Sequence, residues 1–151
     1  MSQDTLSDVL RGIRLRGAVF YYVSYLDSWA AEASAAREIA AAVMPGSEHV
    51  IEYHLIAKGD GWAAVTGLPP VRLTAGDIVM FPQGDAHVLS SAPGLQPVRR
   101  EANWVFETRH QPKPIPISFH YGVEQPGAPM PVDTADTVLI CGGMAYTFLK
   151  S

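Results

Sequence analysis

The sequence has few of the features that mark a secreted protein. It contains one cysteine, Cys141, so an internal disulfide is excluded, and a single thiol fits a reducing compartment. Its first residues, Met1-Ser2-Gln3-Asp4, are polar and lack the apolar segment of a secretion signal. From these absences we expect a cytoplasmic protein.

Long apolar runs and clusters of basic residues are also absent. No stretch approaches the roughly 20 consecutive apolar residues of a membrane-spanning helix, so we expect no membrane partner. Lysine and arginine number 11 against 15 acidic residues, which gives a net charge of −4. The densest basic stretch, Arg11, Arg14 and Arg16, is too sparse for a nucleic-acid footprint. We therefore expect that this chain alone does not bind DNA.

What the chain does contain is typical of one globular domain. Its 151 residues are 48% hydrophobic and 17% charged, which separates it from disordered chains. This length predicts a single domain over residues 1–151. Near its start, Leu6, Val9 and Leu10 recur at helical spacing and predict a short helix over residues 4–12.

Short strands separated by turns are expected over most of the remaining chain. Residues 17–29 have the Val, Phe and Tyr content of a strand. The alanine-rich segment 29–44 has high helix propensity but little apolar bulk, so we expect a partly helical excursion over a barrel mouth. Further strands are expected near 48–58, 61–66, 70–73, 77–81, 86–90, 103–107, 115–121 and 136–148. Many short strands favour a sandwich or a barrel, so the predicted fold class is mostly β with a short N-terminal helix.

The stretch from Gly76 to His87 carries the most specific pattern in the chain. Its apolar run, Ile78-Val79-Met80-Phe81, has the length and composition of a strand buried on both faces, and Pro82 ends it. After a turn at Gly84-Asp85, His87 opens the next short run. We therefore expect a hairpin-like unit with an imidazole at the start of its second strand.

Glu52, His54 and His87 are the candidates for a polar site inside the barrel. Side chains two positions apart in a strand point to the same side, so Glu52 and His54 share one face, flanked by the apolar Val50 and Ile56. His87 begins another strand. A carboxylate with two imidazoles can bind a metal, act as general acid and base, or form hydrogen bonds to a polar ligand in an apolar pocket.

The spacing Gly76-x5-Pro82-x-Gly84-x2-His87 resembles the second sequence motif of the cupin superfamily. It matches that motif at every position except the last, where Ser91 replaces an asparagine. The resemblance implies a cupin-type β-barrel, also called a double-stranded β-helix or jelly roll. In the cupin register, His87 would face the same cavity as Glu52 and His54.

The first cupin motif is matched only in its second half, Glu52-x6-Gly59. Its His-x-His pair should lie near residues 45–48, but the chain has Pro-Gly-Ser-Glu there and His49 is out of register. The usual site of three histidines and one glutamate is therefore incomplete. Glu52, His54 and His87 could still hold a divalent metal such as Zn, Fe, Mn or Ni, with His49 as a reserve ligand.

Longer segments resemble the cupin-like sensor domains found at the N-terminus of AraC-type transcriptional regulators. The similar segments are Leu10–Phe20, Glu48–Leu55, Leu73–Ser91 and Leu139–Gly142. The resemblance implies a small-molecule-sensing barrel that such regulators attach to a C-terminal pair of helix-turn-helix motifs. Nothing follows Ser151 in this sequence, so we expect DNA binding only through a C-terminal domain that this chain lacks.

Two functions follow from the pattern and its resemblances. In a sensor, a small-molecule effector would contact Glu52, His54 and His87, with Tyr22 and Trp62 as cavity walls. In a small metal-dependent cupin enzyme, of the dioxygenase or isomerase type, the same three ionisable residues would hold a metal with open coordination positions. We favour the sensor because the His-x-His pair is absent.

The remaining histidines and the oligomeric state complete the expectations. His110 and His120 are expected to be hydrogen-bonded core residues, which is a commoner role of a lone buried histidine than that of a ligand. Open sheet edges would also permit a homodimer.

Overall fold

A computed structural model describes residues 13–97, 103–121, 123–125 and 130–148 of the protein. The helix predicted over residues 4–12 lies outside these residues. The strands are β1 (Ile13–Leu26), β2 (Ala30–Ala33), β3 (Val50–Lys58), β4 (Asp60–Val65), β5 (Val71–Thr74), β6 (Ile78–Phe81), β7 (His87–Ser90), β8 (Ile115–His120), β9 (Val123–Gln125) and β10 (Thr137–Phe148). The helices are α2 (Ala36–Val43) and α3 (Asn103–Thr108).

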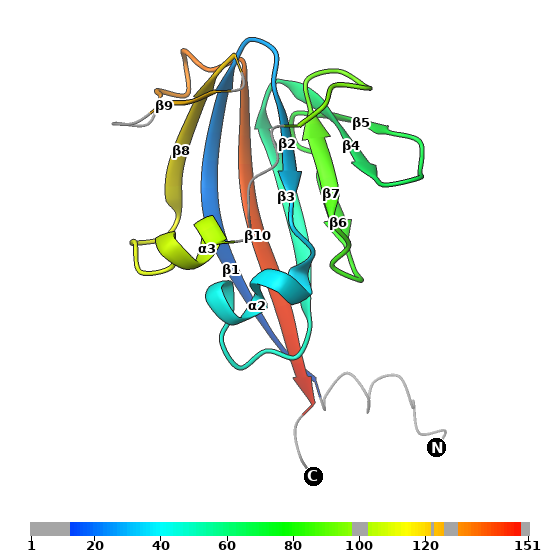
Figure 1. Ribbon diagram of the computed structural model, residues 1–151, viewed down its shortest axis with the longest axis vertical. Coiled ribbons are helices and arrows are strands. Elements are labelled where there is room, and N and C mark those ends of the chain that lie inside the picture. The colour runs from blue at the N-terminus through cyan, green and yellow to red at the C-terminus, as the bar shows by residue number, and fades with distance from the viewer. Residues whose placement is uncertain (1–12, 98–102, 122, 126–129, 149–151) are drawn as a thin grey trace, which may run out of the picture.

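The strands form two sheets that face each other (Figure 1). One sheet has the order β6-β3-β10-β1-β8-β9, and the other has the order β2-β7-β4-β5. The pairing is antiparallel except between β1 and β8. The predicted fold class, a mostly-β barrel of the double-stranded β-helix type, is confirmed.

The core lies between the sheets because β3 and its neighbours alternate buried and half-buried side chains. Along β3, Val50, Glu52, His54 and Ile56 are buried while the residues between them are not. Ile56 packs against Leu139 of β10 and against side chains of the opposite sheet in one apolar cluster. In a strand, alternate side chains point to the same side, so every second residue of β3 faces the interior of the barrel. Two of these residues, Glu52 and His54, are ionisable groups in apolar surroundings.

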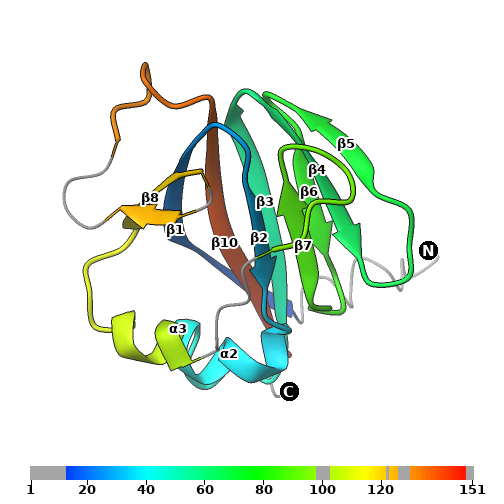
Figure 2. The ribbon, with the colours of Figure 1, turned by 45° about the horizontal axis from the view of Figure 1, so that its top comes forward.

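Helices α2 and α3 cover one end of the barrel (Figure 2). Ile39 and Val43 of α2 pack against Phe20 and Val50, so this short helix is held by its apolar face. The first turn of α2 has no side-chain cap, and the backbone N–H of Ala36 instead donates a hydrogen bond to the Gly84 carbonyl at 2.8 Å. The predicted partly helical excursion is confirmed over 36–43, whereas strand β2 was not expected.

Two predictions for the motif stretch are wrong. β6 pairs with β3 in one sheet, whereas β7 pairs with β2 and β4 in the other, so the stretch crosses between sheets and is not a hairpin. β6 is also not buried on both faces, because it is an edge strand whose outward-facing Ile78 and Met80 are 59% and 45% exposed. The crossing places the strands before and after the turn, β6 and β7, in different sheets.

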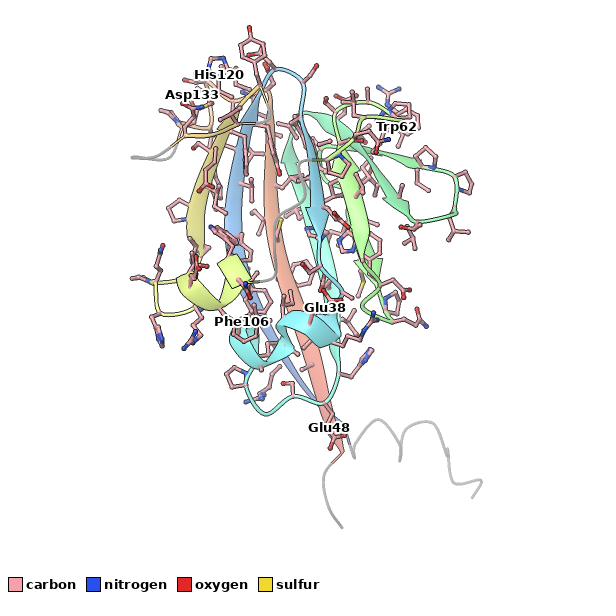
Figure 3. The ribbon with its side chains drawn as sticks, viewed as in Figure 1. Glu38, Glu48, Trp62, Phe106, His120 and Asp133 are labelled. Atoms are coloured by element: carbon pink, nitrogen blue, oxygen red, sulfur yellow. The ribbon has the colours of Figure 1, made fainter. Side chains whose placement is uncertain are left out.

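Other local predictions also need correction. Residues 103–107, predicted as a strand, belong to the helix α3. The prediction was wrong because an apolar run this short does not distinguish the periodicity of a helix from that of a strand. His110 is exposed and is not a core residue. His120 is half-buried at the end of β8 (Figure 3), where its Nε2 lies 3.0 Å from the Asp27 carboxylate. Among the described residues, neither helix has the length and apolar character needed to cross a membrane.

Candidate functional site

Glu52, His54 and His87 meet inside the barrel, although they come from strands of different sheets. Glu52 and His54 are neighbours on the inner face of β3, and His87 begins β7 across the interior. Their exposed fractions are only 5%, 6% and 1%. One ligand-type atom of each lies within 4.8 Å of the other two, so the predicted constellation is assembled by the fold.

The two imidazoles form a direct hydrogen bond whose direction follows from a third contact. Nδ1 of His87 lies 2.7 Å from the carbonyl oxygen of Asp85, and a carbonyl only accepts, so Nδ1 of His87 carries the proton. Its Nε2 is then the acceptor for the Nε2–H of His54, at 2.6 Å. Because His54 carries its proton on Nε2, its Nδ1 is unprotonated and keeps a lone pair.

Phe81 fixes the ring of His87 from the other side. The two rings are stacked with centroids 3.5 Å apart and an interplanar angle of 8°. Phe81 is the last residue of β6, and His87 is the first of β7. The stack and the Asp85 hydrogen bond together orient Nε2 of His87 toward His54 and Glu52, whose Oε2 is 3.8 Å away.

Two polar atoms of this cluster are buried without a hydrogen-bond partner. They are Oε1 of Glu52 and Nδ1 of His54. A buried polar group that lacks a partner costs about 1–3 kcal/mol, so native proteins rarely keep one without a reason. Both atoms belong to residues that line the internal cavity, where they are available to a bound species.

Burial changes the protonation of all three residues. It raises the pKa of Glu52 to about 8, so the carboxyl group is mostly protonated at neutral pH. Burial lowers the pKa of His87 to about 4, against the opposing effects of the Asp85 hydrogen bond and charge. Burial, and then the nearby His87, hold the pKa of His54 well below its usual range. The cluster is therefore uncharged at neutral pH when nothing is bound.

The cluster lies at the floor of a cavity of about 380 Å³ between the two sheets. This volume lies within the roughly 300–1,000 Å³ of small-molecule pockets. Glu52 and His54 contribute to the wall, and His87 lies behind them. Most of the lining is apolar or aromatic and comes from β1, β2, α2, α3, β8 and β10. A mostly apolar cavity with a small polar floor is the usual form of a ligand site.

The structure separates the other predicted site residues from this cavity. His49 is half-buried, and its Nε2 lies 2.6 Å from the Pro82 carbonyl, so it is not part of the three-residue cluster. Trp62 lies on the outer side of β4 (Figure 3), because its neighbours Gly61 and Ala63 face inward. Tyr22 is half-buried on β1 and is not among the residues that line the cavity.

Several cavity residues were not predicted from sequence. On β1, a bulge between Val19 and Tyr21 changes the register, so that the consecutive residues Phe20 and Tyr21 both line the cavity. Trp104 of α3 packs against Tyr21, with ring centroids 5.3 Å apart. A strand pattern read with strict alternation selects Tyr22 in place of Tyr21, and no local signal in the sequence marks the bulge.

Cys141 is a further unpredicted part of the wall. It pairs with His54 across β10 and β3 and lines the cavity. Burial, and then the nearby Glu52, raise the pKa of the Cys141 thiol to about 12. The thiol therefore stays protonated and is a poor nucleophile at neutral pH.

Comparison with known proteins agrees with the barrel fold. The sequence model of the Cupin family matches residues 4–148. The chain belongs to the cupin family. No curated protein matches the chain.

Two solved structures resemble this cupin. One is an HTH_3 family transcriptional regulator from Vibrio cholerae, with a TM-score of 0.36 and 11% identity over 93% of this chain and 46% of that one. The other is an uncharacterized conserved protein with a double-stranded β-helix domain from Klebsiella pneumoniae, with a TM-score of 0.32 and 10% identity over 92% of this chain and 74% of that one. The chain thus spans about half the length of the Vibrio cholerae protein.

The cluster of this cupin fits a divalent metal in its donor set. Two imidazoles and a carboxylate are common ligands of Zn and Fe, and Glu52 Oε1 and His54 Nδ1 are unpartnered electron-pair donors. The Nδ1–H of His87 donates to a backbone carbonyl, as ligand histidines usually do. The hydrogen bond between His54 and His87 would have to open if both Nε2 atoms faced one ion.

Proposed function

We propose that this cupin is the effector-binding sensor domain of an AraC-type transcriptional regulator. The observation that carries the proposal is the cavity of about 380 Å³ with unpartnered polar atoms at its floor. The resemblance of Glu48–Leu55, Leu73–Ser91 and Leu139–Gly142 to such sensor domains adds the regulatory context. This role also implies a cytoplasmic location.

In this role the barrel would convert ligand binding into a shift between two states. A ligand changes such an equilibrium only by the difference in its affinity for the two states. β2 and α2 contribute much of one side of the cavity and pack there through alanine and short apolar side chains. A ligand that fills the cavity would press on this side, and the regulator would transmit the change to a DNA-binding half.

Binding of an uncharged fluorescent probe, N-phenyl-1-naphthylamine, tests the cavity directly. We expect saturable binding with one site per chain, and a large loss of affinity in Ala31→Phe, because Ala31 lines the cavity. Ala64→Phe is the matched control, since Ala64 lies on β4 outside the lining residues. Equal probe affinity in Ala31→Phe and wild type would contradict a ligand-binding role for the cavity.

A metal-dependent cupin enzyme is the second candidate, and the cluster of three ligand-type atoms within 4.8 Å favours it. Glu52, His54 and His87 would hold the ion, which would supply Lewis-acid or redox chemistry when bound. The protein would hold the ligand against the aromatic wall and exclude water, since the cluster is almost fully buried. This candidate is tested by measuring whether the protein binds a metal and whether His87→Ala loses that binding.

A further inference from the structure

The edge strands of the two sheets differ in how they are protected from pairing with another chain. In the part of the chain that the structure describes, the edges are β6 and β9 of one sheet and β2 and β5 of the other. β2, β5 and β9 carry the charged residues Glu32, Arg72 and Glu124. β6, Ile78–Phe81, contains neither a charged residue nor a proline. Charges and prolines keep edge strands from joining other sheets, so β6 is an unprotected edge.

The backbone groups of Ile78 and Met80 point to the open side of β6. The N–H of Ile56 on β3 donates a hydrogen bond to the Asp77 carbonyl at 3.0 Å. Alternate residues of an antiparallel strand direct their backbone groups to the same neighbour, so Val79 also faces β3. The N–H and C=O groups of Ile78 and Met80 therefore face away from β3, and among the described residues no turn or loop hydrogen bond uses them. β6 thus offers two donors and two acceptors to a further strand.

The side chains around this edge are apolar as well. Ile78 and Met80 lie on the outer face of the sheet and are 59% and 45% exposed, while Val79 packs against the core. Opposite them on β3 are Leu55 and Tyr53, which are half-buried on the same outer face. Exposed apolar side chains that adjoin one another are typical of protein–protein contact sites.

A second copy of the chain fits this edge in one register. Opposite residues of an antiparallel pair lie on the same face of the sheet. With a two-fold axis at Val79, Ile78 lies opposite the partner's Met80, and the free backbone groups of these two residues meet. An axis at Ile78 or at Met80 would instead place one of them opposite Gly76 or Pro82, which lie outside the strand. The axis at Val79 therefore gives the fullest pairing.

We propose that β6 is an interaction surface for a second copy of this chain, and that two β6 strands pair antiparallel about a two-fold axis at Val79. Each chain contributes the same strand, so the contact is isologous and closes with a dimer. The pairing joins two six-stranded sheets into one continuous sheet. Two strands of four residues bury less than the roughly 1,200–2,000 Å² of a stable interface, so the dimer is weak and dissociates on dilution.

Sedimentation equilibrium of the purified chain between about 1 µM and 1 mM measures this association. We expect a monomer–dimer equilibrium within that range. Ile78→Lys combined with Met80→Lys should weaken the dimer by roughly tenfold or more, because like charges would then face each other across the interface. Leu68→Lys combined with Val71→Lys is the matched control, since these side chains are 63% and 60% exposed near another edge, and it should leave the dimer unchanged.

Two results of this measurement would overturn the inference. One is a wild-type chain that stays monomeric throughout the concentration range, which would exclude a second copy as the occupant of the edge. The other is a variant with both Ile78→Lys and Met80→Lys that dimerises as strongly as the wild type, which would place the interface elsewhere.

Cysteine cross-linking tests the register. Opposite residues at a position such as Val79 have Cα atoms about 4.5 Å apart, which a disulfide can span, so Val79→Cys should form a linked dimer under mild oxidation. Two copies of Ile78 would be diagonal neighbours, roughly 7–8 Å apart, so Ile78→Cys should not. The wild type, whose Cys141 lines the cavity, is the background control. Equal cross-linking of the two variants, or none in Val79→Cys, would overturn the axis at Val79.

These outcomes are independent of what the cavity binds, because Ile78 and Met80 are not among the residues that line it. The variant with both lysines should bind N-phenyl-1-naphthylamine as the wild type does, which also shows that it is folded. Cross-linking of Val79→Cys decides the inference without either lysine. Loss of dimerisation with intact probe binding supports the interface and leaves the proposed function unaffected.

Discussion

The Nε2 atoms of His54 and His87 lie 2.6 Å apart inside the barrel, although the residues belong to strands of different sheets. A hydrogen bond at this distance requires that one ring donates and the other accepts. Burial lowers the pKa of both rings, so the pair is neutral at neutral pH and holds a defined arrangement of protons. The arrangement is set from outside the pair, by the Asp85 carbonyl. It leaves two unpartnered atoms, on Glu52 and His54, available to a ligand.

The burial of Glu52 predicts that the metal-free protein loses stability as the pH rises above 6.5. Folded Glu52 keeps its proton up to a pKa of about 8, whereas the unfolded chain releases it near 4.5. The folded state therefore binds more protons across this window, and stability falls as pH rises through it. At about 1.4 kcal/mol per pH unit, roughly 2 kcal/mol is lost between pH 6.5 and 8.

The histidines act in the opposite sense at lower pH. The pKa of His87 falls from 6.5 to about 4 on folding, so the unfolded chain binds more protons between these values and stability rises with pH there. The pKa of His54 is shifted in the same direction. Stability should therefore be greatest near pH 6.5. Urea unfolding across pH 4–8.5, with EDTA present, measures this maximum.

Glu52→Gln isolates the carboxyl group from other titrations. The amide cannot ionise, so the decline above pH 6.5 should disappear, while the rise below pH 6.5 remains. Glu48→Gln, just before β3 and exposed (Figure 3), should keep the decline of the wild type. An undiminished decline in Glu52→Gln would show that burial of this carboxyl group is not its cause.

The three-residue cluster predicts binding of one divalent metal per chain. Elemental analysis of the purified protein for Fe, Mn, Zn and Ni, followed by Zn titration of EDTA-treated protein, measures it. His87→Ala removes a ligand and should weaken binding by more than the roughly 10- to 100-fold that loss of an outer-shell partner causes. Binding should also weaken as pH falls, because the ion must displace the proton of Glu52.

His49→Ala is the control for this experiment. His49 lies outside the cluster, with its Nε2 at the Pro82 carbonyl, so its removal should leave metal affinity unchanged. A stoichiometric redox metal that is lost in His87→Ala would favour the enzyme over the sensor. If neither wild type nor His49→Ala binds metal stoichiometrically, the metal-dependent enzyme is ruled out.

Gly84 predicts a stability effect that depends on close packing and not only on backbone conformation. Its φ is +65°, and an added Cβ would overlap with the Cβ of Ala36 and lie 3.0 Å from the Val50 carbonyl. Gly46 has a φ of +80° with nothing near an added Cβ. Gly46→Ala should therefore cost only about 1–2 kcal/mol for the left-handed conformation.

Gly84→Ala should cost about 1–3 kcal/mol more than that, because overpacking adds to the conformational term. The extra loss would arise where the turn of the second cupin motif contacts the start of α2. Urea unfolding of the two variants side by side measures the difference in the free energy of unfolding. Equal losses in the two variants would show that the space between Gly84 and Ala36 accommodates a methyl group without overpacking.

Sequence reasoning was sound where the pattern was long or the spacing specific. Alternation along residues 50–56 correctly placed Glu52 and His54 on one buried face, and the motif spacing correctly grouped His87 with them. It failed where a short apolar run was ambiguous. Ile78 and Met80 are exposed because β6 lies at a sheet edge, and residues 103–107 are helical.

The sequence by itself determined the strand periods, the turns and the identity of the three cluster residues, because these follow from local geometry and from spacing along the chain. Only the tertiary structure decided which aromatic residues line the cavity, since the bulge in β1 selects Tyr21 over Tyr22. The same holds for Glu32 and Glu124, which lie at edges of two different sheets. Contacts between such distant segments depend on the order in which strands pair, and local spacing does not encode that order.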